Sequence, residues 1–441
     1  MKHYTLLLLL FLLVSVTSLI SCGDDDPSKL NPYPNEARAN GSFYVYDNIA
    51  FNVKGNNATI VGFDDKNISV ANLNIPATIS VFDANADTYV QIKVVEIGDQ
   101  AFKGRSDLQQ LNIPNSVTII SNEAFAECPS LQSVKIDGGR IGVQCFYNCK
   151  SLATATLGSN VTHVGDEAFA ECPSLQSVKI DGGSIGVQCF YNCKSLTTAT
   201  FGSNVTNFGD EAFVGTALKS VNIPSGSIGN KSFWMCTLES ITLGTGVTSI
   251  GDEAFYYNTA LKMVDMGNSN VSRIGKKAFQ QCTELQTVKL NPGIKLIDEY
   301  AFEFCWKMNL SQIRLPESLE RVNAFAFYRC WALGDIILPN SCRVIGERAF
   351  SDCRNLTGIV FGTNLETLSN GALSGSYTEV MVFKGTNPPY IDGNLALSVE
   401  SYCYSVLSIY VPDGSVNAYK NALPSAYKNK VKPLSQYSGE L

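Results

Sequence analysis

The sequence of 441 residues is acidic, with a formal net charge of −7 at pH 7, and it contains only two histidines. The negative charge argues against the basic footprint that is typical of nucleic-acid-binding proteins. The shortage of histidine argues against most acid–base and metal-dependent enzymes. Because the chain is longer than one hydrophobic core usually serves, it forms either several domains or one elongated array.

Residues 1–21 are predicted to be a signal peptide. Lys2 supplies a positive start, and residues 6–14 form an unbroken apolar run that is too short for a membrane span of about 20 residues. The run leads to the sequence Leu-Ile-Ser-Cys-Gly, which resembles the lipobox of bacterial lipoproteins. This resemblance implies cleavage before Cys22 and lipid attachment to its thiol. The alternative is an ordinary signal peptide followed by a chance cysteine.

Residues 22–40 are predicted to be a flexible tether, because they are polar and rich in proline and asparagine. Aspartates at positions 24–26 follow Cys22 closely, and this arrangement resembles the export signal of Bacteroidetes surface lipoproteins. The resemblance implies a protein on the outer face of the outer membrane. Such a protein is tethered through its lipid anchor only and is not inserted into the bilayer.

Residues 41–96 are predicted to form a β-rich N-terminal cap. The segments 43–46 and 58–63 have the aromatic and β-branched character that is typical of strands. A cap is expected at each end of a repeat array, because an open end would expose apolar surface and unpaired strand edges.

A phenylalanine recurs through residues 97–383 at intervals of roughly 20 to 25 residues, the range of solenoid repeats. The positions are Phe102, Phe125, Phe146, Phe169, Phe190, Phe213, Phe233, Phe255, Phe279, Phe302, Phe327 and Phe350, with Leu373 next in phase. No repeat can bury its apolar side chains alone, but stacked repeats cover one another. The period predicts a curved solenoid of about thirteen rungs, each rung being one full turn.

Most repeats share one order of residues: Phe-x-x-Cys, Leu-x-x-Val-x-Ile, a Pro or Gly, and Val-Thr-x-Ile-Gly. The alternation predicts a first and a second short strand in each rung. First strands are expected to end at Pro114, Pro224, Pro316 and Pro339. The Gly-x-x-Ala-Phe-x-x-Cys part, which we call the Phe segment, is predicted to form a tight helical turn on the opposite side.

This pattern resembles the leucine-rich repeats of BspA type, which occur in many bacterial surface proteins, and the resemblance covers roughly residues 97–383. It implies a β-rich solenoid of the α/β leucine-rich repeat class. Residues 384–441 are predicted to be the C-terminal cap. The reason is that Ile-Tyr-Val-Pro-Asp-Gly at 409–414, followed by Ala-Tyr-Lys at 418–420, resembles the usual end of such arrays.

The chain has 14 cysteines, and nine of them fall three residues after a regularly spaced phenylalanine. One interpretation is a zinc or redox site, which would need a converging tetrahedral set of ligands. A second is disulfides between neighbouring rungs, although stacked Cβ atoms lie further apart than a disulfide requires. The interpretation that we favour is a column of buried thiols that pack as small hydrophobic side chains.

The sequence contains no recognisable catalytic constellation. The near-copied block that begins at Glu123 and again at Glu167 has His163 in one copy and Asn207 in the other, a poor arrangement for a general base. Adjacent carboxylates such as Asp252 and Glu253 recur before the phenylalanine and are interpreted as solvated turn residues or as charges at the start of a helix, not as a glycosidase pair. We therefore expect no enzyme activity, no cofactor and no metal site.

The outward positions of the first strands form one candidate binding stripe, expected on the concave side of the solenoid. Its residues are Lys135, Thr156, Lys179, Thr200, Thr242, Lys289 and Arg314. The basic members would place local positive charge on an acidic protein, suited to an acidic protein or a glycan. The alternative is an ordinary solvated sheet face.

Aromatic residues just after the regularly spaced phenylalanines form a second candidate, in the seventh to eleventh rungs. The proposed patch consists of Trp234, Tyr256, Tyr257, Trp306, Tyr328 and Trp331. Clustered aromatics mark interface hot spots or sugar-stacking platforms. The alternative is that they pack along the convex edge as an extension of the core.

The family resemblance implies a role in adhesion, that is, attachment to an extracellular or cell-surface protein of a host or of another bacterium. A different class of function is an accessory lipoprotein that captures glycans for nutrient uptake. In either case we expect a monomer that binds no nucleic acid and contacts the membrane through its lipid alone.

Overall fold

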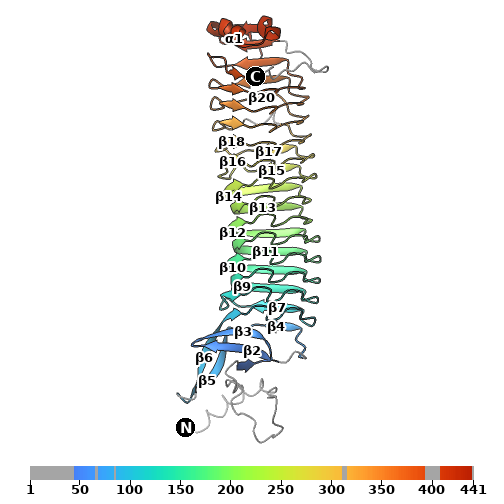
Figure 1. The fold of residues 1–441 in the computed structure, drawn as a ribbon, viewed down its shortest axis with the longest axis vertical. Coiled ribbons are helices and arrows are strands. Elements are labelled where there is room, and N and C mark those ends of the chain that lie inside the picture. The colour runs from blue at the N-terminus through green and yellow to red at the C-terminus, as the bar shows by residue number, and fades with distance from the viewer. Residues whose placement is uncertain (1–43, 65–67, 84–85, 310–314, 393–407, 440–441) are drawn as a thin grey trace.

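The structure is a computed structural model that describes residues 44–64, 68–83, 86–309, 315–392 and 408–439. The predicted signal peptide, Cys22 and the tether lie outside the described residues. Figure 1 shows one tall column of stacked rungs, with the first strands at one end and helix α1 (Val416–Ala422) at the other. This architecture confirms the predicted solenoid.

The described residues before the first rung form a layer of β-strands. Their bounds are β1 (Tyr44–Tyr46), β2 (Ile49–Lys54), β3 (Asn57–Phe63), β4 (Asn72–Asn74), β5 (Thr78–Asp83) and β6 (Thr88–Ile97). Strands β1, β2 and β3 pair antiparallel in that order, and β5 pairs antiparallel with β6. Strand β6 also pairs in parallel with β8 (Ile119–Ile120). The first layer is therefore joined to the solenoid by the same parallel ladder that holds the rungs together.

From β9 to β14 the first and second strands of each rung run together as one long strand. Their bounds are β9 (Ser133–Ile141), β10 (Thr154–Val164), β11 (Ser177–Ile185), β12 (Thr198–Phe208), β13 (Ser220–Ile228) and β14 (Ser240–Ile250). The parallel ladders carry register shifts at the corner between the two halves. Gly139 lies at such a corner with a φ of 90°, and a Cβ there would lie 2.5 Å from the carbonyl oxygen of Val117. The corner therefore requires glycine.

The prediction of two separate strands in every rung is wrong for these long strands. Pro114 does follow the end of a strand, β7 (Gln110–Ile113), as expected. Pro224 instead lies inside β13 and does not end it. The register shifts between Ile223 and Ser225, so Pro224 occupies an irregular position where the ladder needs no N–H donor.

The remaining rungs have short separate strands. In the large sheet these are β15 (Met263–Asp265), β16 (Arg273–Ile274), β17 (Thr287–Lys289), β18 (Leu296–Ile297), β19 (Arg321–Val322), β21 (Val344–Ile345), β23 (Thr367–Leu368) and β25 (Tyr390–Ile391). A second, parallel sheet contains β20 (Ile336–Ile337), β22 (Gly358–Phe361), β24 (Val380–Phe383), β26 (Ser408–Val411) and β27 (Val431–Pro433).

Short helices cover the C-terminal end of the column. Besides α1 they are η2 (Asp413–Ser415), η3 (Ser425–Lys430) and η4 (Leu434–Gln436). Tyr419 of α1 is buried against Phe383 of the last full rung, and its hydroxyl donates to the carbonyl oxygen of Gly385 at 2.8 Å. Across the described part of the chain, no helix has the length and apolar character needed to cross a bilayer.

The Phe segment is not helical, which corrects the prediction. Its backbone N–H groups donate to the next rung instead: Phe125 N–H donates to the carbonyl oxygen of Cys145, and Glu123 N–H donates to that of Val143. Residues two before and two after each phenylalanine adopt a left-handed φ, for example 52° at Glu123 and 58° at Glu127. This conformation turns the chain and directs the backbone N–H groups of the Phe segment along the column. They can then donate to the carbonyl groups of the next rung, which would otherwise be buried without a partner.

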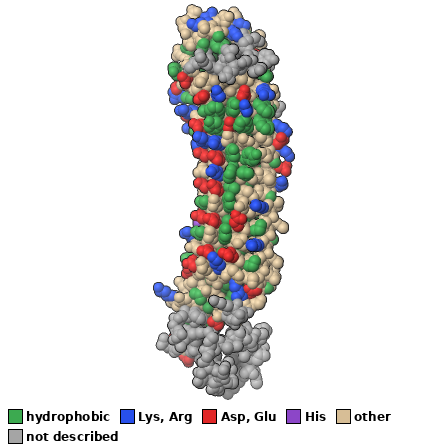
Figure 2. All heavy atoms as spheres, turned by 45° about the vertical axis from the view of Figure 1, so that its right-hand side comes forward, with side chains coloured by type: hydrophobic (Ala, Val, Ile, Leu, Met, Phe, Trp, Pro, Cys, Tyr) green, Lys and Arg blue, Asp and Glu red, His purple; other side chains and the backbone are tan. Residues whose placement is uncertain are grey.

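The column bends only slightly in the two whole-molecule views (Figures 1 and 2), whereas the sequence predicts a curved body. The reason is that the Phe segment forms tight turns instead of a helix. Rings of successive rungs lie 4.9 to 5.4 Å apart there, close to the strand spacing of about 4.8 Å on the other side. Helices would need about 8 to 10 Å per rung and would force the column to curve.

The core contains one continuous ladder of phenylalanine rings. Each ring from Phe102 to Phe350 stacks on the next, and the ring of Phe63 closes the lower end edge-on to Phe102. Beside this ladder, all twelve cysteines of the described residues are free and buried. The structure therefore agrees with the interpretation of the cysteines as packed thiols.

The thiols also form hydrogen bonds that the sequence interpretation did not anticipate. Cys149 Sγ donates to the carbonyl oxygen of Phe125 at 3.3 Å, and Cys330 Sγ donates to that of Phe302 at 3.1 Å. Where the cysteine is replaced, Asn258 Nδ2 and Ser376 Oγ each donate to the phenylalanine carbonyl of the preceding rung. The position three residues after the phenylalanine therefore requires a small, buried side chain that donates a hydrogen bond, and cysteine is the residue found there most often.

Candidate functional site

The outward side chains of the first strands form one continuous surface, which we call the strand face. The described lysines of the predicted stripe lie here, and each is paired with an aspartate. The pairs, with their nitrogen–oxygen distances, are Lys135–Asp137 at 3.0 Å, Lys179–Asp181 at 2.5 Å and Lys289–Asp265 at 3.5 Å. The strand face thus carries neutralised pairs among hydroxyls such as Thr156, Thr200 and Thr242. Arg314 lies outside the described residues.

The aromatic residues of the second candidate do not form one patch, which corrects the prediction of a single cluster. Trp234 and Tyr256 are tilted neighbours with ring centroids 6.3 Å apart, and Tyr257 lies 6.0 Å from Tyr256. In the next rung the position after the phenylalanine holds Gln280, which hydrogen-bonds to Glu303 of the following rung. This polar pair separates the group around Trp234 from the aromatics of the later rungs.

Glu303 is an unusual member of this column, because its side chain is largely enclosed and only 7% of the residue is exposed. Burial raises the pKa of its carboxyl group above the ordinary value, while the hydrogen bond from Gln280 and the charges of Lys277 and Arg329 act in the opposite direction. A carboxylate enclosed in this way organises its neighbours and is poorly placed to meet a ligand.

Trp306 and Trp331 form a second aromatic group. Their rings are parallel within 6° with centroids 5.0 Å apart, and the guanidinium of Arg354 lies 4.9 Å above the ring of Trp331. We call Trp306, Trp331 and Arg354 the aromatic edge. Trp331 has one ring face against Trp306 and the other against Arg354, so this group presents mainly ring edges and the outer side of Trp306, which is 40% exposed.

A third group lies in the same two rungs as Trp306 and Trp331. Tyr328 packs edge-on against Phe304 and Phe325, with centroids 5.9 and 5.7 Å apart. Arg329 covers the ring of Tyr328 at 5.1 Å and pairs with Asp352 at 3.3 Å. Its charge is therefore neutralised by a carboxylate of the next rung. Tyr328 belongs to this packed group, so the structure separates it from the stacked tryptophans.

The comparisons with known proteins agree with this architecture. The model of the BspA type leucine rich repeat region matches residues 81–184, 138–227, 183–308 and 304–387. The chain belongs to the BspA-type leucine-rich repeat family. No curated protein matches the chain.

Several solved structures are similar to this BspA-type chain. A leucine-rich repeat protein from Bacteroides ovatus is 25% identical, with 72% of this chain and 94% of that chain covered and a TM-score of 0.45. A leucine rich cell surface protein from Faecalibacterium prausnitzii is 27% identical, with the same coverage and a TM-score of 0.38. The pneumococcal vaccine antigen PcpA is 18% identical, with 89% of this chain and 97% of that chain covered and a TM-score of 0.36.

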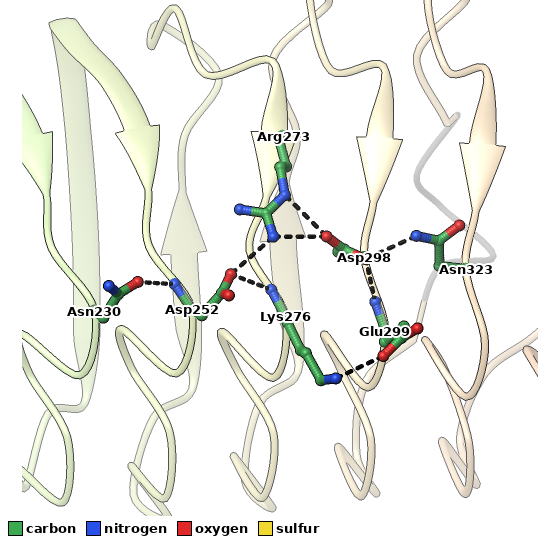
Figure 3. Close-up of polar contacts among 7 residues, drawn as sticks. All are labelled: Asn230, Asp252, Arg273, Lys276, Asp298, Glu299 and Asn323. Carbon is green, nitrogen blue, oxygen red and sulfur yellow. Dashed lines mark hydrogen bonds and ion pairs between the residues drawn. The ribbon is translucent and has the colours of Figure 1, made fainter.

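The acidic residue after Ile-Gly, as at Asp99 and Asp252, lies in a turn and has a structural role that its interpretation as a solvated turn residue did not include. Figure 3 shows Asp252 Oδ1 accepting the backbone N–H of Lys276 at 2.9 Å, just as Asn230 accepts that of Asp252. Arg273 then joins Asp252 to Asp298 at 2.8 and 2.7 Å. These side chains hold neighbouring rungs together.

No residue group of the described chain has the geometry of a catalytic or metal centre. His163 Nδ1 lies 2.7 Å from Ser184 Oγ, and burial holds the pKa of its imidazole below the ordinary value. Within the described residues, no group of three or more His, Cys, Asp or Glu side chains is placed to hold a metal ion.

A shallow groove of about 680 Å³ is lined partly by Glu320, Arg343 and Glu366. The guanidinium of Arg343 donates a hydrogen bond to the carboxylate of Glu366.

Figure 2 shows where apolar side chains gather on one side of the column. They form a vertical stripe, with acidic side chains along much of one flank.

The sequence prediction missed Arg354, which completes the aromatic edge. The signal was available: Arg354 follows Cys353 as Trp331 follows Cys330 and Trp306 follows Cys305. Equivalent positions of successive rungs are neighbours in space, so aligning the repeats places these three side chains in one row.

Proposed function

We propose that this BspA-type chain is a surface-anchored binding protein that docks an extracellular or cell-surface protein on its aromatic edge. The observation that carries the proposal is the stacked pair of Trp306 and Trp331 with Arg354 above it. Tryptophan, tyrosine and arginine are enriched among the residues that supply most interface binding energy. A rigid stack loses little side-chain entropy when a partner docks.

The protein ligand is favoured over a glycan on geometric grounds. A sugar ring stacks on the flat face of an aromatic side chain, and both faces of Trp331 are already covered by Trp306 and Arg354. The glycan-capture function therefore remains the second candidate, with the outer face of Trp306 as its best platform.

The anchor is proposed to be a lipid on Cys22, which would place the chain on the outer membrane with its solenoid outside the cell. The relative from Faecalibacterium prausnitzii is named a cell surface protein, which supports this location. Mass spectrometry of the mature N-terminus is expected to find a diacylated Cys22, and Cys22→Ala is expected to release the protein from the membrane fraction. A mature N-terminus at any other residue would contradict the anchor.

The binding site is tested with the unlipidated mature chain against parallel panels of extracellular-matrix proteins, bacterial surface proteins and glycans. Trp306→Ala with Trp331→Ala is expected to weaken binding of the captured protein by roughly 30-fold or more. The matched double variant on the strand face, Lys135→Glu with Lys179→Glu, is expected to bind normally. Loss of binding only in the lysine variant would move the site to the strand face.

A further inference from the structure

We infer that the partner of the aromatic edge contributes an acidic polypeptide segment, with a carboxylate that is received by Arg354. This inference rests on the proposed protein-binding function and adds the chemistry of the partner. It follows from the charge state of the cations around the two tryptophans and from the way Arg354 is held.

Arg354 is the charged member of the aromatic edge, and no described carboxylate neutralises it. Nearby cations are neutralised: Lys307 pairs with Glu284 at 2.6 Å, and Arg329 pairs with Asp352 at 3.3 Å. Arg354 is exposed and has no ion pair with any carboxylate in the described ranges of the chain. Its guanidinium carbon lies over the ring of Trp331, 4.9 Å from the ring centroid.

Stacking on Trp331 leaves the chemistry of Arg354 available. The guanidinium carbon lies 4.9 Å over the centre of the Trp331 ring, and no guanidinium N–H group of Arg354 donates a hydrogen bond to a described residue. Its five N–H donors are therefore available to a ligand. A planar guanidinium with a fixed orientation binds a carboxylate through two parallel hydrogen bonds. Because the stack already restricts the side chain, less rotamer entropy is lost when an anion binds.

The row also defines the shape of the segment. Trp306, Trp331, Arg354 and Tyr377 occupy the same position in four successive rungs, and three rung spacings of about 4.8 Å give a row of about 14 Å. An extended segment rises about 3.3 Å per residue, so roughly four or five residues span the row. The expected segment has an acidic residue opposite Arg354 and apolar residues toward the tryptophans.

The net charge of the chain strengthens this argument. At −7 the protein as a whole repels an acidic partner, so such a partner needs a local cation to dock in one orientation. Arg354, which no described carboxylate neutralises, attracts the carboxylate of the partner. Its place beside the apolar stack fixes the position at which the partner segment docks. A basic partner would be attracted by most of the surface and would have no reason to choose the aromatic edge.

The test uses an immobilised peptide library in matched pairs, each pair differing only by Glu against Gln between apolar residues. The mature chain is expected to bind the Glu members about tenfold more tightly than the Gln members. Arg354→Gln is expected to abolish this preference, and Arg354→Lys is expected to retain part of it. The control Arg343→Gln removes an arginine that is paired with Glu366 and should keep the full preference.

The outcomes separate the two proposals. If Trp306→Ala and Trp331→Ala weaken binding but Glu and Gln peptides bind equally well, the acidic segment is wrong and the aromatic edge stands. If the captured protein binds equally to the tryptophan variants, both proposals fail. Binding to uronic-acid oligosaccharides without any Glu-dependent peptide binding would overturn the acidic segment in favour of a glycan. Self-association that Arg354→Gln abolishes would overturn it in favour of a second copy.

Discussion

At the scale of single residues, the rungs differ at positions where the repeat pattern is broken, and these breaks have measurable consequences. Ser232 occupies the place of the buried alanine that precedes the phenylalanine in most rungs. Its hydroxyl is fully enclosed and has no hydrogen-bond partner. Ser376 is buried too, but its hydroxyl donates to the carbonyl oxygen of Phe350. The same residue type therefore destabilises one rung and stabilises another.

Ser232→Ala is expected to raise the free energy of unfolding by about 1 kcal/mol, because it removes a buried polar group that has no partner. Ser376→Ala is the matched control and is expected to lower it by about 1 to 2 kcal/mol, because it leaves a buried carbonyl unsatisfied. Urea unfolding followed by circular dichroism measures both. A loss of stability in Ser232→Ala would contradict the hydrogen-bond assignment.

The left-handed positions around each phenylalanine predict a second effect. Met235 has a φ of 52° and an exposed side chain, and Gly104 and Gly215 hold the equivalent place in other rungs. Met235→Gly is expected to stabilise the protein by about 0.5 kcal/mol, since relief of strain exceeds the added chain entropy. Met235→Val is expected to destabilise it, because β-branched side chains fit this conformation worst. Melting temperatures that rank Val above Gly would refute this assignment.

At the scale of elements, the phenylalanine ladder and the thiol column depend on each other. Nine of the twelve described thiols, those three residues after a phenylalanine, donate to the carbonyl of the preceding rung's phenylalanine and so tie the Phe segments together. Burial raises the pKa of the Cys236 and Cys282 thiols to about 12. The native state therefore holds them protonated.

Stability is expected to fall in alkaline solution for this reason. A thiol whose folded pKa is about 12 against an ordinary 9.0 contributes fully below pH 9 and loses its contribution as pH rises toward 12. In that window each such thiol lowers the free energy of unfolding by about 1.4 kcal/mol per pH unit. Chemical denaturation between pH 7 and pH 11 measures this slope, and a flat profile above pH 9 would contradict it.

The same burial predicts that the described thiols resist alkylation in the native state. Labelling with and without denaturant, read by mass spectrometry, is expected to modify the twelve described cysteines only after unfolding. A mass change on reduction alone, before any labelling, would instead indicate disulfides.

At the scale of the whole molecule, the solenoid is a sum of rungs that contact mainly their neighbours. The near-copied block recurs after 44 residues, from Glu123 to Glu167. Because interfaces between rungs repeat, removing residues 123–166 joins two surfaces that already fit each other. The length of the column is therefore separable from the aromatic edge.

A chain that lacks residues 123–166 is expected to fold into a shorter column and to bind the partner of the aromatic edge with unchanged affinity. A chain that ends before α1 exposes Phe383 and is the contrasting variant; it is expected to aggregate. Light scattering and partner binding test both. Loss of binding in the internal deletion would mean that the partner also contacts the removed rungs.

The phenylalanine period predicted a stack of about thirteen rungs and favoured a buried column of cysteines, because each apolar position has the same neighbours in every rung. Three features needed the tertiary structure. The Phe segment is a run of tight turns whose N–H groups also donate between rungs; Asp252 holds the next rung; and the aromatic residues separate into groups around Gln280 and Glu303. All three depend on contacts between residues 19 or more positions apart, which a local pattern does not record.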